Sequence, residues 1–139
     1  MAEATVPDGV RQGVYITLAY VLLFKIFIIG QAITKFQLKA LYASKGQKMD
    51  RYYNTKDKKM LAWDRVVGNM LEQSMPFLVL FWLNVGVLTL KGEEAHGHVI
   101  TAAWFYIVAR ALYPVAWFSG GGGPGGPRIK ILFSTVPMY

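Results

Sequence analysis

Three long apolar stretches, each interrupted by one charged residue, constrain what this chain can fold into. They cover residues 14–34, 66–90 and 98–118, and the interrupting charges are Lys25, Glu72 and Arg110. A helix that crosses a bilayer needs roughly 20 mostly apolar residues, so each stretch is long enough to cross. Because lipid cannot satisfy backbone polar groups, the stretches predict an all-α integral membrane protein.

The composition supports this interpretation and excludes other classes. Of 139 residues, enough for one domain, 54% are hydrophobic while the net charge is +7, which is too apolar for a disordered or an ordinary soluble chain. The chain has no cysteine, so any sulfur chemistry must come from a bound substrate. His96 and His98 are too few to predict a metal site.

A fourth apolar stretch, residues 129–139, is shorter than the others. It would reach only about 16 Å, half a bilayer. We therefore expect a four-helix transmembrane bundle in one domain, residues 1–139, whose last helix is cut short or ends inside an assembly. The glycine-rich segment 120–126 before it predicts a flexible connection and lacks the Gly-Lys-Ser/Thr of a phosphate loop.

The positive charge is concentrated between the first two apolar stretches. Residues 35–65 contain nine Lys or Arg and three Asp, a local net charge of +6. The positive-inside rule therefore predicts that this loop faces the cytoplasm and that both termini face the opposite side. A basic loop beside a membrane is expected to contact anionic headgroups, and we expect no nucleic-acid partner.

The three charges inside the spans are predicted to lie at one depth. Counting from the helix ends places Lys25, Glu72 and Arg110 roughly 10 to 14 Å below the cytoplasmic surface. Charges inside spans are costly and usually face the bundle interior, which predicts a buried charge cluster. The residues leave two interpretations open: an interhelical ion pair that fixes packing, or part of a site.

The polar face of the second stretch favours a site. Arg65, Asn69 and Glu72 follow i, i+4, i+7 spacing, and Pro76 is expected to bend the helix below them. A forked cation, an amide and a carboxylate together suit a small zwitterionic peptide. The residues expected to close the pocket from neighbouring helices are Lys25, Arg110 and Tyr113.

These motifs resemble the MAPEG family, the membrane-associated proteins in eicosanoid and glutathione metabolism. The segment from Arg65 to Pro76 resembles the family's Arg-x-x-x-Asn-x-x-Glu with a proline four residues on. Further matching segments are Lys25 with the helix exit at Lys39-Ala40-Leu41, Ala109-Arg110-Ala-Leu-Tyr113, and Pro127-Arg128. The lysine and the helix exit are similar to those of prostaglandin E synthase-like members.

The resemblance implies a homotrimer of four-helix bundles that binds glutathione as co-substrate between neighbouring subunits, near the cytoplasmic face. It implies glutathione binding by Arg65, Asn69, Glu72 and Tyr113, with help from Lys39 at the carboxylates. Arg128 matches the arginine that activates the sulfur. The implied protein is a microsomal glutathione transferase-like enzyme, a transferase, peroxidase or isomerase, that uses no metal and acts on a lipophilic electrophile.

Two questions stay open at this point. The short fourth stretch is also compatible with a non-catalytic accessory or structural subunit of a larger membrane complex. The resemblance implies the endoplasmic reticulum, while the sequence leaves another organelle membrane open, because it carries no recognisable retention signal or transit peptide.

Overall fold

The computed structural model describes residues 6–50, 57–92 and 96–119, and this part of the chain forms three long helices. They are α1 (Asp8–Ser44), α2 (Lys58–Leu90) and α3 (His96–Ser119). Each contains one of the predicted spans and is long and apolar enough to cross a membrane, which confirms the all-helical prediction. The expected fourth helix, residues 129–139, and the glycine-rich segment lie outside the described residues.

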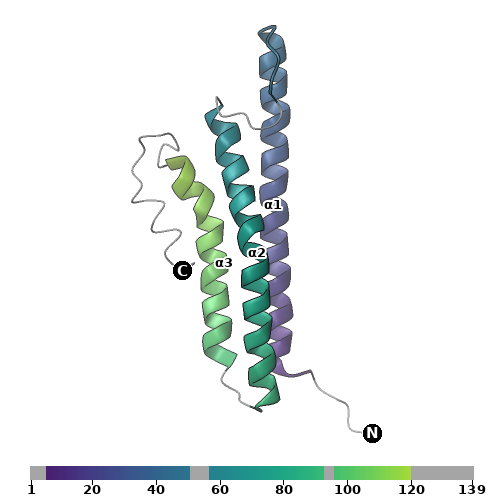
Figure 1. Ribbon diagram of the computed structural model, residues 1–139, viewed down its shortest axis with the longest axis vertical. Helices are drawn as coiled ribbons and strands as arrows, with labels where there is room; N and C mark the ends of the chain where they lie inside the picture. The colour runs from purple at the N-terminus through teal and green to yellow at the C-terminus, as the bar shows by residue number, and fades with distance from the viewer. Residues whose placement is uncertain (1–5, 51–56, 93–95, 120–139) are drawn as a thin grey trace.

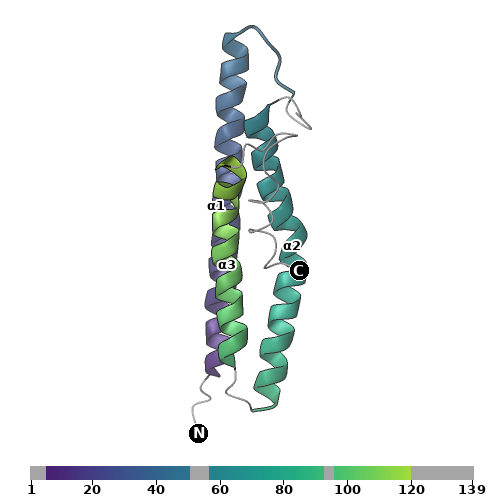
Figure 2. The ribbon, with the colours of Figure 1, turned by 90° about the vertical axis from the view of Figure 1, so that its left-hand side faces the viewer.

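The three helices run up, down and up again, side by side (Figures 1 and 2). The end of α1, the start of α2 and the end of α3 therefore lie toward the same end of the bundle. With 37 residues, α1 is roughly 55 Å long and extends past the start of α2. Part of the predicted basic loop is thus helical, because α1 continues ten residues beyond residue 34.

Both ends of the first connection have ordinary capping chemistry. The Asp57 carboxylate accepts hydrogen bonds from the backbone amides of Lys59 (3.0 Å) and Met60 (3.1 Å) and so caps α2. After α1, Gly46 adopts φ +65°, a conformation that glycine takes at little cost, and its amide donates to the Ala43 carbonyl. The connection is therefore shorter than the apolar pattern alone predicted.

Aromatic rings fill the centre of the bundle, where all three helices meet. The Phe77 ring of α2 lies 5.1 Å from the Tyr20 ring of α1 and 4.2 Å from the Tyr106 ring of α3, centroid to centroid. The Tyr20 hydroxyl donates to the Met70 carbonyl at 3.1 Å. The rings and the buried aliphatic side chains around them hold the polar groups of α2 and α3 in place. Those aliphatic side chains include Ile16, Val66, Val85 and Ile107.

Two glycines of α1 allow tryptophans of α2 to lie against the helix backbone. A Cβ built on Gly13 would lie 2.9 Å from the Trp82 ring, and one built on Gly30 would overlap the Trp63 ring. The Trp82 indole N–H also donates to the Thr17 hydroxyl at 3.1 Å. Small residues that admit close approach are typical of helix contacts in membranes.

Apolar side chains also cover the outside of the bundle. Leu22, Leu80 and Phe105 are among the exposed ones, with 63%, 60% and 74% of their surface accessible. Such a surface is unfavourable in water and favourable in lipid. The protein is therefore integral to a membrane, as predicted.

Candidate functional site

Hydrogen bonds join the polar face of α2 to α3. The Arg110 Nη1 donates to the Asn69 Oδ1 at 3.2 Å, and the Asn69 Nδ2 donates to the Tyr113 hydroxyl at 3.0 Å. The Arg110 Nε donates to the Tyr106 hydroxyl at 3.0 Å. Since Tyr106, Arg110 and Tyr113 are four and three residues apart, they project from one side of α3 toward α2.

Arg110 is the buried charged residue among those described, with 1% of its surface exposed. Its guanidinium carbon lies 5.1 Å from the centre of the Tyr106 ring, within the range of a cation–π contact. Among the described residues, its Nη2 has no hydrogen-bond partner. The buried Arg110 guanidinium is therefore contacted by the Asn69 amide oxygen, the Tyr106 hydroxyl and the face of the Tyr106 ring.

Asn69 differs from the free ligand donor that the sequence suggested. Its oxygen accepts from Arg110, and one of its amide hydrogens is used by Tyr113. An amide has two N–H donors and one oxygen, so these two bonds fix which way the group faces. Asn69 is thus an oriented group whose orientation depends on α3.

Arg65 and Glu72, which flank Asn69 along α2, have exposed side chains. The predicted stripe therefore lies on the edge of α2, with its middle turned toward α3 and its two ends turned outward. Pro76 and Pro114 each come four residues after a charged residue, Glu72 and Arg110 respectively. Because proline lacks an N–H, the carbonyls of those two residues lose their usual helical partner.

The structure does not bring Lys25, Glu72 and Arg110 together within one chain. Lys25 and Glu72 are exposed whereas Arg110 is buried. Among the described residues, the ion pairs are Arg11–Asp8 and Lys35–Asp64, and neither contains one of these three. Equal depth along three helices does not fix the direction in which each side chain points, and this is why the expected cluster does not form inside the chain.

Lys39 and Arg128 were also predicted to belong to the site. Lys39 is exposed on the part of α1 that extends past α2, so it is not part of the α2–α3 network. Arg128, predicted to activate the sulfur, lies outside the described residues.

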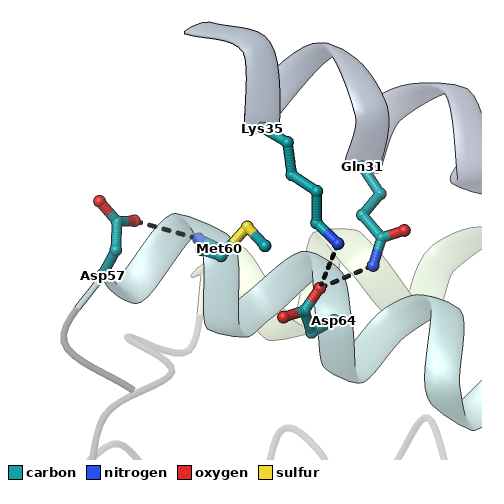
Figure 3. A network of polar contacts seen from close by, with 5 residues as sticks. All are labelled: Gln31, Lys35, Asp57, Met60 and Asp64. Carbon is teal, nitrogen blue, oxygen red and sulfur yellow. Dashed lines mark hydrogen bonds and ion pairs between the residues drawn. The ribbon is translucent and has the colours of Figure 1, made fainter. Parts of the chain in front are cut away.

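Sequence reasoning missed a polar contact between α1 and α2 (Figure 3). Asp64 accepts a hydrogen bond from the Gln31 Nε2 at 2.7 Å, and its Oδ1 lies 3.4 Å from the Lys35 Nζ. Gln31 and Lys35 are four residues apart and project toward Asp64 from one face of α1. Their spacing was visible in the sequence, but the facing of Asp64 was not. This contact fixes the first turns of α2, including the neighbouring Arg65, against α1.

Tyr106 was also missed, although its spacing from Arg110 pointed to it. A tyrosine four residues before an intramembrane arginine on the same helix is well placed to accept a hydrogen bond. In the structure Tyr106 accepts the hydrogen bond from Arg110 and also stacks on the Phe77 ring.

The fold and the site define a multi-spanning helical membrane protein with a polar centre between its second and third helices. The model of the MAPEG family matches residues 15–136, and the chain therefore belongs to the MAPEG family. Comparison with curated proteins and with solved structures gave no match.

Proposed function

We propose that the protein is a glutathione-dependent membrane enzyme, a transferase, peroxidase or isomerase, that acts on a lipophilic electrophile. The observation that carries the proposal is the edge of α2, where exposed Arg65 and Glu72 flank Asn69. The amide of Asn69 is held by Arg110 and Tyr113. Family membership supports a glutathione-related function at the level of the family.

The spacing of these groups suits a tripeptide with charges at both ends. Arg65 and Glu72 are seven residues apart, roughly 10 Å along the helix axis, and an extended tripeptide spans about the same length. Arg65 would pair with a carboxylate through its forked N–H groups, and Glu72 would accept from the amine. Asn69, between them, would contact the peptide backbone in the orientation that α3 imposes.

The sulfur needs a cation close to it. An unperturbed cysteine thiol has a pKa near 8.5, and a guanidinium within hydrogen-bond reach lowers the pKa and favours the thiolate. The resemblance assigns this role to Arg128. The electrophile would reach the thiolate from the bilayer, because apolar side chains form the outer surface of the helices.

The assembly is proposed to be a homotrimer in which a neighbouring subunit covers this edge of α2. Lys25, Arg65 and Glu72 are exposed on helices whose other outward side chains are largely apolar. Leaving charges against lipid is costly, so cover by protein or ligand is favoured. We propose the endoplasmic reticulum as the membrane on family grounds alone.

Glutathione binding tests the proposal directly. We expect glutathione to raise the unfolding temperature of the detergent-solubilised full chain, with stabilisation of about 2.7 kcal/mol at a ligand concentration 100 times Kd. Arg65→Ala should remove most of this stabilisation. Arg11→Ala, which changes an arginine paired with Asp8 near the start of α1, is the matched control and should keep it.

No stabilisation by glutathione, or equal stabilisation of the wild type and the Arg65→Ala variant, would contradict the proposal. The accessory-subunit alternative would then be tested by purification from native membranes. Stoichiometric co-migration with a larger complex would support that alternative, and a free homo-oligomer would reject it.

A further inference from the structure

Exposed lysines gather where α1 ends and α2 begins. We call this region the basic end and define it by the described, exposed residues Lys39, Lys45, Lys48, Lys58 and Lys59. Lys39 lies near the end of α1, Lys45 and Lys48 follow that end, and Lys58 and Lys59 open α2. The two helices bring them to the same end of the bundle (Figure 1).

The described carboxylates of this region are fewer than the lysines of the basic end, so the region stays positive. Asp57 is engaged by the backbone amides of α2, and Asp64 by Gln31 and Lys35 (Figure 3). Asp50 is the exposed carboxylate among the described residues here. Because Asp57 already caps α2, an incoming anion would be bound by the lysines and not by the helix N-terminus.

The length of α1 places Lys39 and Lys45 close to the membrane surface. Its ten residues beyond residue 34 rise roughly 15 Å, whereas one headgroup layer is about 5 to 8 Å thick. Lys39 therefore lies at headgroup depth, and Lys45, six residues further along, lies roughly 9 Å beyond it, within about one Debye length. Phe36, exposed at 71%, lies two residues beyond residue 34 and suits the boundary between acyl chains and headgroups.

We propose that the basic end binds the headgroups of anionic phospholipids in the leaflet next to it. Clusters of four to eight basic residues directly beside a spanning helix attract phosphatidylserine or phosphoinositide headgroups. The exposed Phe36 on the same extension favours lipid over a soluble polyanion such as RNA. This inference is independent of the proposed enzymatic function.

The opposite end of the bundle provides a built-in comparison. At that end, Arg11 is paired with Asp8. Lys91, which follows directly after α2, is exposed. One variant therefore removes two positive charges from the basic end, and a second removes two from the opposite end. Comparing the two distinguishes a local effect on lipid binding from an effect of total charge. The matched variants are Lys45→Gln/Lys48→Gln at the basic end and Arg11→Gln/Lys91→Gln at the other.

The experiment measures lipid bound to the detergent-solubilised full chain by native mass spectrometry, with equal amounts of phosphatidylserine and phosphatidylcholine present. We expect the wild type to retain phosphatidylserine preferentially. One lysine near a surface contributes about 1 kcal/mol, or about fivefold, so Lys45→Gln/Lys48→Gln should lower the preference by at least about fivefold. Arg11→Gln/Lys91→Gln should leave it unchanged, and added salt should weaken it.

Three results would overturn the proposal: no phosphatidylserine preference in the wild type, an equal loss in both variants, or tighter binding of an RNA oligonucleotide than of the lipid. The first can be read from the wild type alone, so the proposal stays testable even if one variant does not fold. Size-exclusion chromatography of each variant establishes that it is folded before lipid is added.

Discussion

Asn69 and Arg110 depend on each other at the contact between α2 and α3, where Arg110 is buried. The guanidinium has three nitrogens, of which two are bonded within the described residues. A hydrogen bond to a charged group contributes about 1.5 to 3 kcal/mol, and leaving such a group unsatisfied costs more in a buried site. The stability of the α2–α3 contact should thus be sensitive to this one amide.

We predict that Asn69→Ala lowers the free energy of unfolding by about 1 to 3 kcal/mol, because Arg110 and Tyr113 both lose a partner. Asn84→Ala is the control on the same helix. Asn84 is exposed and donates to the Leu80 carbonyl one turn earlier, so its loss should have little effect. Thermal unfolding in detergent without ligand measures both, and equal destabilisation by the two variants would contradict the assignment.

The polar residues were predictable from sequence to different extents. The spacing of Arg65, Asn69 and Glu72 predicted one polar edge, and Arg110 and Tyr113 were expected to approach it from another helix. The structure places Arg110 and Tyr113 beside Asn69. Which of these side chains face inward could not be predicted, because that direction is set by how the helices pack and not by spacing along one helix.

At the scale of the helices, the contact between α1 and α2 depends on glycines beneath tryptophan rings. The Trp63 ring lies over Gly30 and contacts Phe27 edge-on, with ring centroids 6.5 Å apart. The ring is held on more than one side, so it cannot swing away freely if the glycine gains a side chain.

We predict that Gly30→Ala lowers the free energy of unfolding by about 1 to 2 kcal/mol. Overpacking against Trp63 costs about 1 to 3 kcal/mol, and the better helix propensity of alanine offsets part of it. Gly86→Ala in α2 is the control, since nothing lies within 4 Å of its added Cβ, and it should be neutral or slightly stabilising. Thermal unfolding that ranks the two variants in the opposite order would contradict this packing.

The contact of Asp64 with Gln31 and Lys35 allows a second prediction at this scale. Asp64→Ala should lower the free energy of unfolding by about 1 kcal/mol, because an ion pair whose side chains are 28% and 32% exposed adds little to the hydrogen bond. It should also weaken glutathione binding, since Arg65 follows directly on the same turn. Asp50→Ala, which removes an exposed carboxylate, should change neither unfolding nor glutathione binding, as measured by thermal shift.

The helices themselves were largely predictable, because runs of apolar residues specify spans almost by themselves. The ends of the helices were less predictable. The extension of α1 to Ser44 carries lysines and polar residues that resemble a loop in composition, and it is helical because nothing before Gly46 breaks the helix. The close approach of Trp63 to Gly30 could not be predicted from residue spacing, because the two residues lie on different helices.

At the scale of the whole molecule, the separation of charge predicts its orientation. The chain has no cysteine, so single introduced cysteines report sidedness without background. We expect Gln47→Cys, at the basic end, to react with a membrane-impermeant maleimide only from the cytoplasmic side. Lys91→Cys should react only from the opposite side. Labelling of both from the same side would contradict both the three-span order of the described helices and the orientation.

The buried guanidinium between α2 and α3 also has a consequence for biosynthesis. An arginine at the centre of a helix makes insertion into lipid unfavourable by about 2.5 to 3.5 kcal/mol on insertion scales. Translation delivers Asn69 to the membrane before Arg110, so the partner is already in place when α3 leaves the ribosome. We therefore expect α3 to insert into the membrane poorly when it is expressed alone and efficiently when α2 precedes it. Insertion of the third span would then depend on the second.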